Sequence, residues 1–224
     1  LTHAHEHFGD QFKNLKRRRF TAHTTCSCCN AAMREPAAVT GDAGQAYEVL
    51  TVPFVHKCFK HYFMKAGYSK FRDPTVTVVQ TSAHMAYTGG RALEMKHGRV
   101  TFFLSKLWHA TQALLQMKIY RIGNAWVFQS CGLPIGGPIS GVGLEFCLAY
   151  LEDLFDSITW PKFARRFRLH GRRRDFVAAS RYADDTILAS FFICKNCLAS
   201  MLVGTYAKEV PFDITTESFL YCSS

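Results

Sequence analysis

Long apolar runs are absent from this sequence of 224 residues. No stretch approaches the roughly 18 residues of a membrane-spanning helix, so we expect no membrane partner. No signal peptide, internal repeat or low-complexity tract is visible. Hydrophobic residues make up 48% of the chain and charged residues only 20%. This composition is typical of a globular protein with its own core and excludes a disordered chain.

A disulfide framework is also missing. The nine cysteines are odd in number and irregularly spaced, which favours reduced thiols in an intracellular protein, nuclear or cytoplasmic. Cys194 and Cys197 have the spacing of zinc ligands, and Cys26, Cys28 and Cys29 could supply partners. However, the two groups lie far apart in the sequence, and Cys194 to Cys197 is expected to begin a helix. Buried free thiols are therefore the favoured interpretation.

Acidic residues are scarce. The chain has 17 Asp and Glu against 27 Lys and Arg, a net charge of +10, which favours a polyanion such as nucleic acid. A basic cluster lies at 13–19, and a denser one at 162–174. The arginines of the second cluster are candidate phosphate contacts expected to flank a groove leading to the active site: Arg165, Arg166, Arg168, Arg172, Arg173 and Arg174. The alternative is a solvated face.

Strand-like and helix-like segments alternate along the chain. A strand is expected over 37–40, with a turn at Gly41-Asp42 and a helix after it, and short β-like segments follow within 68–108. Helical periodicity covers 107–120. An amphipathic helix is expected over 143–156, with Glu145, Glu152 and Asp156 on its polar stripe. Its apolar stripe should pack against a sheet through Leu144, Leu148, Leu151 and Phe155. A last strand is expected near 218–221. The pattern indicates a mixed fold of the α+β kind.

Two adjacent carboxylates, Asp184 and Asp185, lie between apolar runs that suit strands. Ala183-Asp184 falls where a tight hairpin turn would be. Neighbouring side chains of an extended chain point to opposite faces, so one carboxylate should bind a cation squarely and the other at its edge. Oxygen ligands suit Mg²⁺. A solvated turn is the alternative for this dipeptide taken alone.

The flanking sequence resembles reverse transcriptases. Tyr182-Ala-Asp-Asp185 is similar to their catalytic hairpin, and Gly41 to Val49 to their first catalytic segment. Gly132 to Ser140 resembles the segment that supports template and nucleotide, and Val210 to Ile214 the approach to the primer grip. The resemblance covers residue 36 to the chain end. It implies the palm of a right-hand polymerase, an antiparallel sheet backed by helices, with partial fingers and no thumb.

The resemblance also implies roles for single residues. Asp42, Asp184 and Asp185 would be catalytic and, with the carbonyl of Ala43, would hold two Mg²⁺ ions, or Mn²⁺ in their place. The nucleotide-binding residues would be Tyr47, Pro134, Gly136, Gly137 and Tyr182. The Tyr47 ring would exclude a 2′-hydroxyl and so favour deoxynucleotides. Ile135 departs from the family, because many members have Gln there. The glycines can equally form a turn before a helix that Ser140 caps.

The implied function is RNA-directed DNA polymerase activity of a retroelement (retrotransposon), a nucleotidyltransferase with an RNA template, a DNA primer and dNTP. We expect a basic segment over 1–35, in which a remnant of the fingers can lie, and the palm over 36–224. A family-variable insertion is expected within 51–110. The chain would be a palm-centred piece of a larger polymerase. A non-catalytic RNA-binding relic of the same fold is the alternative.

Overall fold

The computed structural model describes residues 2–18, 25–33, 35–79, 85–88, 98–134, 137, 139–206, 209–211 and 213–215. The chain forms two compact units. The first unit comprises residues 1–46 and 148–224, and the second comprises residues 47–147. Within the described residues, no helix is both long and apolar enough to cross a membrane.

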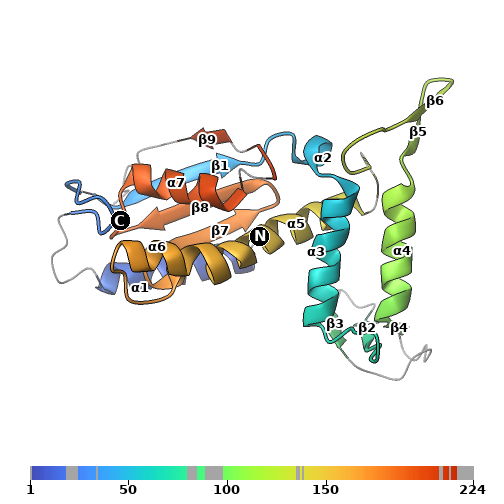
Figure 1. The fold of residues 1–224 in the computed structure, drawn as a ribbon, viewed down its shortest axis with the longest axis horizontal. Coiled ribbons are helices and arrows are strands. Elements are labelled where there is room, and N and C mark those ends of the chain that lie inside the picture. Colours follow the sequence, from blue (N-terminus) through green and yellow to red (C-terminus); the bar gives the residue numbers. More distant parts are fainter. Residues whose placement is uncertain are drawn as a thin grey trace. The chain divides into compact units, whose positions relative to one another are not determined.

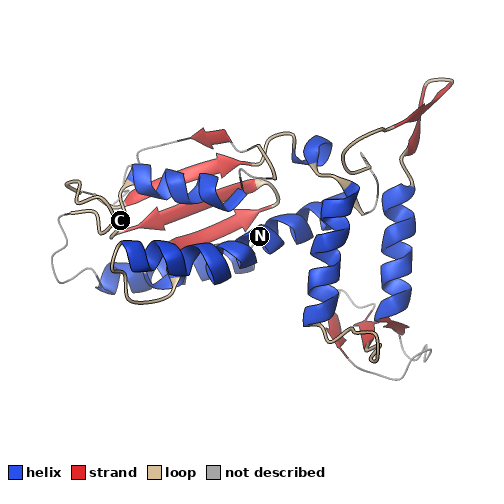
Figure 2. Ribbon diagram, viewed as in Figure 1, coloured by secondary structure: helices blue, strands red, loops and turns tan. Residues whose placement is uncertain are grey.

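The first unit is built on a four-stranded antiparallel sheet with the strand order β7-β8-β1-β9 (Figures 1 and 2). The strands are β1 (Ala37–Asp42), β7 (Ala178–Tyr182), β8 (Asp185–Ser190) and β9 (Asp213–Thr215). β1 and β8 are the two central strands of this sheet. Both contain buried residues, among them Val39 in β1 and Leu188 and Ala189 in β8. Small and branched apolar side chains of this kind suit a sheet covered by helices.

Helices cover this sheet. They are α1 (Thr2–Arg18), the second half of α5 (Ser140–Leu154), a π-helical turn (Phe155–Thr159), α6 (Trp160–Arg166), a 3₁₀ turn (Arg173–Asp175) and α7 (Lys195–Tyr206). α7 packs against β1 and β8. α1 packs against β7, where the side chain of Gln11 accepts the N–H of Ala179 at 3.3 Å and so satisfies a donor on the edge strand. The burial expected for the apolar stripe is confirmed, since Leu144, Leu148 and Leu151 of α5 and Phe155 of the π-helical turn are all buried.

The second unit contains two packed helices, α3 (Val52–Lys65) and α4 (Leu104–Gln116), and the first half of α5. It also has a sheet of β2 (Thr75–Val79), β3 (Met85–Thr88) and β4 (Arg99–Phe103), and a hairpin of β5 (Ile119–Ile122) and β6 (Ala125–Phe128). The short helix α2 (Ala46–Val49) lies at its start. Thr51 caps α3 by accepting the N–H of Phe54 at 3.4 Å.

Three element boundaries differ from the sequence-based expectation. β1 continues through Gly41 and Asp42, where a turn was expected, because both residues pair with β8 on one side and β9 on the other. The expected helix over 107–120 begins and ends earlier, and residues 119–122 form a strand instead. The amphipathic helix starts at Ser140 and runs on into the π-helical turn. The last expected strand, 218–221, lies outside the described residues.

Candidate active site

The adjacent aspartates lie on a β-hairpin, as the sequence predicts. β7 and β8 pair from Ala178↔Ala189 to Tyr182↔Asp185, which leaves Ala183 and Asp184 as a two-residue turn. Ala183 has a φ of 52°, a left-handed conformation that two-residue hairpins require but that costs a residue with a Cβ about 1 kcal/mol. The turn is therefore a strained point between two strands that are well paired.

Asp42 is brought beside this turn from the other central strand. It is the last residue of β1, and its Cα pairs with that of Asp185. The N–H of Ala43 donates to the carbonyl of Asp184 at 3.2 Å. On its other side, Asp42 pairs with Asp213 of β9. The three predicted catalytic positions thus meet at one end of the first sheet, although 142 residues separate Asp42 from Asp184 in the sequence.

The pairing changes which carboxylate faces Asp42. Sequence reasoning made Asp184 its main partner and put Asp185 at the edge. In an antiparallel pair, however, directly opposed residues share a face of the sheet, and here the opposed residue is Asp185. Asp42 and Asp185 are exposed and Asp184 is half-buried. Within the described part of the chain, the three carboxylates are not gathered into a group that could hold a metal ion. Mutual repulsion of like charges disfavours closer approach of carboxylates.

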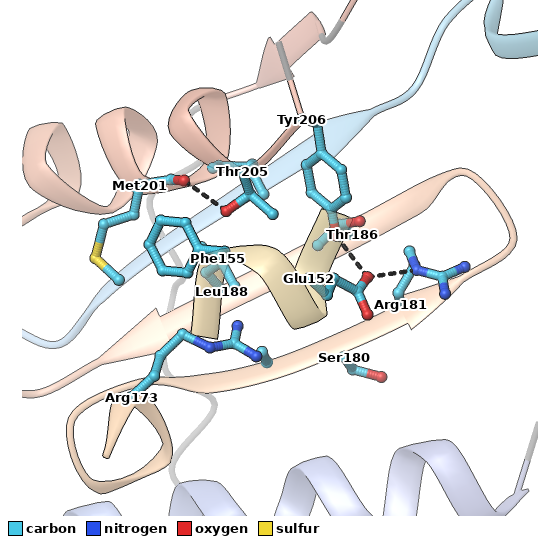
Figure 3. A pocket seen from close by; sticks show the side chains of 12 residues that line it. Glu152, Phe155, Arg173, Ser180, Arg181, Thr186, Leu188, Met201, Thr205 and Tyr206 are labelled. Carbon is cyan, nitrogen blue, oxygen red and sulfur yellow. Dashed lines mark hydrogen bonds and ion pairs between the residues drawn. The ribbon is translucent and has the colours of Figure 1, made fainter. Parts of the chain in front are cut away.

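A partly buried polar network lies beside the hairpin (Figure 3). Arg181 Nε donates to Glu152 Oε1 at 2.7 Å, and the Tyr206 hydroxyl donates to the same oxygen at 2.6 Å. Arg181 Nη1 also donates to the carbonyl of Ala183 at 2.9 Å. Burial raises the pKa of Tyr206, and the Glu152 carboxylate raises it further. The network joins α5, β7 and α7 to the strained turn.

Sequence reasoning missed this network. It assigned Glu152 and Asp156 to a polar stripe facing away from the core. Glu152 is instead half-buried against Arg181, and Asp156 pairs with Arg173, whose Nε lies 2.6 Å from Asp156 Oδ1. Helical periodicity shows which positions are polar but not whether a distant strand supplies an arginine to meet them. The arginine two residues before the Ala183-Asp184 turn was the available signal.

The pocket next to the network is small. It has a volume of about 110 Å³ and is lined by residues of α5, β7, β8 and α7 that include Glu152, Arg181 and Tyr206 (Figure 3). Ligand pockets of drug or nucleotide size usually occupy about 300–1,000 Å³. The space therefore suits a few water molecules and is smaller than a pocket of nucleotide size.

The expected nucleotide-binding segments meet in the second unit. The N–H of Leu133 donates to the carbonyl of Tyr47 at 2.7 Å. Gly132 has a φ of 75°, and a Cβ there would lie only 2.3 Å from the same carbonyl oxygen. Pro134, which follows Leu133, is buried. The segment at Gly132 is thus hydrogen-bonded to the backbone of α2. The two backbones lie so close that only glycine fits at position 132.

The remaining residues expected to contact the nucleotide lie in different parts of the chain and differ in burial. Gly137 is half-buried, and its N–H donates to the carbonyl of Pro134 at 3.1 Å. The Ser140 hydroxyl donates to that same carbonyl, so it ties the loop to the start of α5. Tyr182, in the first unit, is exposed. Gly136 and Ile135 lie outside the described residues.

The arginine cluster lies away from the aspartates. Arg165, Arg166, Arg168, Arg172 and Arg174 are exposed, whereas Arg173 is held by Asp156. The cluster ends where β7 begins, and the Ala183-Asp184 turn lies where β7 ends, roughly 16 Å along the strand (Figure 1). The end of the cluster next to β7 is therefore separated from the turn by the length of that strand, and the expectation that the arginines flank a groove leading to the active site stays a prediction. Their exposure still permits phosphate contacts at the other end of the sheet.

Comparison with known proteins shows the fold. No family model matches the sequence, and no curated protein is significantly similar to it. Telomerase from Candida albicans, solved in complex with a TWJ fragment of telomeric RNA, matches with a TM-score of 0.57 and 12% identity over 97% of this chain and 30% of that one. Apo telomerase from Candida tropicalis matches with a TM-score of 0.57 and 11% identity over 95% of this chain and 31% of that one.

Telomerase from Candida tropicalis in complex with a TWJ fragment of telomeric RNA gives a TM-score of 0.54 at 10% identity, over 96% of this chain and 29% of that one. The chain thus spans about a third of the length of these structures. Telomerase is a reverse-transcriptase-related enzyme, and a likeness at this identity concerns the fold alone. The chain has a reverse-transcriptase-like fold.

Proposed function

We propose that this chain carries the catalytic carboxylates of an RNA-directed DNA polymerase of retroelement type. The observation that carries the proposal is the pairing of Asp42 with Asp185 beside the Ala183-Asp184 turn, within a reverse-transcriptase-like fold. Two strands far apart in the sequence bring acidic residues to one point, an electrostatic cost that a cation-binding site explains.

The donor set at this point agrees in kind with Mg²⁺ or Mn²⁺. Asp42, Asp184 and Asp185 offer carboxylate oxygens and Ala43 a main-chain carbonyl, which are the ligands such hard cations prefer. A pair of bound cations would lower the pKa of a primer 3′-hydroxyl and neutralise charge on the departing pyrophosphate. The chain itself contributes the support of the turn, where Arg181 holds the carbonyl of Ala183.

The proposed substrates are an RNA template, a DNA primer and dNTP. The solved neighbours include telomerase bound to telomeric RNA fragments, which supports nucleic acid as a partner of this fold. The exposed members of the arginine cluster would contact phosphates. Tyr47, held through its carbonyl by Leu133, would present its ring to the sugar and exclude a 2′-hydroxyl by steric overlap.

Primer extension tests the proposal. The wild-type chain should extend a DNA primer on an RNA template with dNTP and Mg²⁺. Asp185→Asn should lower the rate about 100-fold or more, because loss of a ligand removes several kcal/mol of charge stabilisation. Asp10→Asn is the matched control, since Asp10 is exposed on α1 and its contact to Lys13, at 3.9 Å, is a loose surface ion pair. Its rate should be that of the wild type.

One outcome would favour the non-catalytic, RNA-binding alternative. If the wild-type chain binds an RNA–DNA hybrid but extends no primer with either Mg²⁺ or Mn²⁺, catalysis is refuted for this chain and binding remains. The observation that favours RNA binding without catalysis is the separation of the arginine cluster from the aspartates by the length of β7.

Sugar choice gives an independent test of the polymerase class. Replacing Tyr47 by Val should raise the kcat/KM for rGTP relative to dGTP, while dGTP incorporation falls much less. The comparison uses one primed RNA template for both nucleotides. An unchanged ratio in Tyr47→Val, or no dGTP preference in the wild type, would show that this ring does not select the sugar.

A further inference from the structure

Four cysteines from two distant segments form one cluster in the first unit. They are Cys26, Cys29, Cys194 and Cys197, and their Sγ atoms all lie within 4.8 Å of one another. The Sγ atoms of Cys29 and Cys194 are 3.5 Å apart, although the two residues are 165 positions apart in the chain. Four sulfurs bound tetrahedrally to one zinc at 2.3 Å lie about 3.8 Å from each other. The observed Sγ–Sγ distances, from 3.5 Å for Cys29 and Cys194 up to 4.8 Å at most, bracket that value.

The sequence spacing has the pattern of a zinc site. Cys26-Ser-Cys-Cys29 and Cys194-Lys-Asn-Cys197 are both C-x₂-C pairs. Two such pairs are the usual source of a Cys₄ zinc centre. Sequence reasoning favoured buried free thiols because the two pairs lie far apart in the sequence and the second was expected to begin a helix. The fold removes the reason for that interpretation by bringing the two pairs together.

The backbone around Cys26 is arranged to support a thiolate. The N–H of Cys28 donates to Cys26 Sγ at 3.4 Å, and the N–H of Cys194 donates to it at 3.1 Å. Amide donors to ligand sulfurs are typical of the surroundings that orient metal ligands.

A tight turn presents the first pair. The N–H of Cys26 donates to the carbonyl of Ala31 at 2.7 Å, and the N–H of Asn30, which has a φ of 58°, donates to the carbonyl of Cys26 at 2.9 Å. The N–H of Ser27 donates to the carbonyl of Phe192 at 2.8 Å, which fixes this turn against the segment before Cys194. The two pairs are therefore positioned by hydrogen bonds that do not depend on the thiols.

Core packing does not explain the cluster. Cys58 and Cys147 are fully buried, as structural thiols usually are. In the cluster only Cys26 is fully buried, whereas Cys29 is exposed and Cys194 and Cys197 are half-buried. Four thiols gathered at a partly open surface gain little from apolar contact. Their shared feature is ligand chemistry.

We propose that Cys26, Cys29, Cys194 and Cys197 bind one structural Zn²⁺ ion. Four thiolates fill a tetrahedral shell and leave no position for water or substrate, so the site is structural and not catalytic. It would join the turn before β1 to the start of α7, beyond the Ala37↔Ser190 end of the central strand pair and opposite the Asp42↔Asp185 end (Figure 1). A cross-link there would oppose slippage of β1 against β8. Such slippage would shift Asp42 relative to Asp185.

Metal analysis of the full chain tests the proposal. The protein is produced with zinc in the medium, purified without chelator and measured by mass spectrometry for metals. We expect about one zinc per chain in the wild type and about tenfold less in Cys29→Ser and in Cys197→Ser. Cys28→Ser is the matched control, because its thiol lies outside the cluster and its amide, which donates to Cys26, is kept. It should retain the full content.

Thiol protection on the wild type gives a second readout that requires no variant to fold. In the zinc-loaded chain, the four cluster cysteines should resist alkylation while the exposed Cys131 reacts. Removal of zinc by a chelator should expose the four and lower the melting temperature, and added zinc should reverse both changes. A wild type without zinc, equal alkylation with and without zinc, iron at the same stoichiometry, or loss of zinc in Cys28→Ser would each overturn the proposal.

Discussion

Arg181 is the side chain whose removal should most weaken the support of the catalytic hairpin. Arg181→Met keeps much of the side-chain volume but removes the ion pair to Glu152 at 2.7 Å and the hydrogen bond to Ala183 at 2.9 Å. Glu152 then keeps its negative charge and the hydrogen bond from the Tyr206 hydroxyl, but loses the positive charge that Arg181 supplied.

The size of the effect follows from burial. Breaking a fully buried pair costs about 3–5 kcal/mol, and an exposed pair at most about 1 kcal/mol. The Arg181 side chain is 12% exposed and that of Glu152 29%. The partial exposure of Glu152 places the expected loss between these limits, at about 2–3 kcal/mol. For a chain of this length the melting temperature should fall by about 4–12 °C.

Urea and thermal unfolding followed by circular dichroism measure this loss. Arg165→Met is the matched control, because Arg165 is exposed on α6 and its replacement should change stability by less than about 0.5 kcal/mol. In a double-mutant cycle with Glu152→Gln, the coupling energy should be about 1–3 kcal/mol. If Arg181→Met unfolds no more easily than Arg165→Met, the network does not support the hairpin.

Three further changes test other parts of the structure. Gly132→Ala places a Cβ 2.3 Å from the Tyr47 carbonyl at a positive φ and should cost at least about 2 kcal/mol in urea unfolding, whereas Gly141→Ala, in open space on α5, should be neutral or stabilising by up to about 1 kcal/mol. Replacing Arg165, Arg166 and Arg174 by Ala should make the fall of the log binding constant for an RNA–DNA hybrid with log salt less steep, by about 2–3 in slope. An unchanged slope would mean that these arginines form a solvated face. The folded-state pKa of Tyr206 is raised above its ordinary value of 10. Stability should therefore decline as pH rises above about 10, because the Tyr206 hydroxyl ionises there in the unfolded chain but not in the folded one. Tyr206→Phe should lessen that alkaline decline, and equal declines would contradict the buried position of the hydroxyl.

Local sequence signals predicted the parts of the fold that local chemistry determines. The apolar strands around Ala183-Asp184 gave the hairpin, and the spacing of Leu144, Leu148 and Leu151 gave the buried face of α5. In each case the residues that decide the structure lie within a few positions of one another.

Features that depend on strand register or on distant partners were not predictable in this way. The pairing of Asp42 with Asp185 follows from how β1 aligns with β8, and a shift by one residue would have exchanged the faces. Glu152 was assigned to solvent because its partner, Arg181, is on a strand 29 residues away. The cysteine cluster joins two pairs from nearly opposite ends of the chain, which no local pattern records.

The most direct test of the proposed function measures whether Asp42 and Asp185 act as a unit. The assay is the single-turnover rate of dNTP incorporation on an RNA template for the wild type, Asp42→Asn, Asp185→Asn and the double variant, with hybrid affinity measured alongside. Each single variant should be slower by about 100-fold or more at unchanged hybrid affinity, and the double variant should be no slower than the singles, because residues that act together lose their effect together. Incorporation by Asp42→Asn at the wild-type rate, or rate losses that simply multiply in the double variant, would contradict a shared catalytic site.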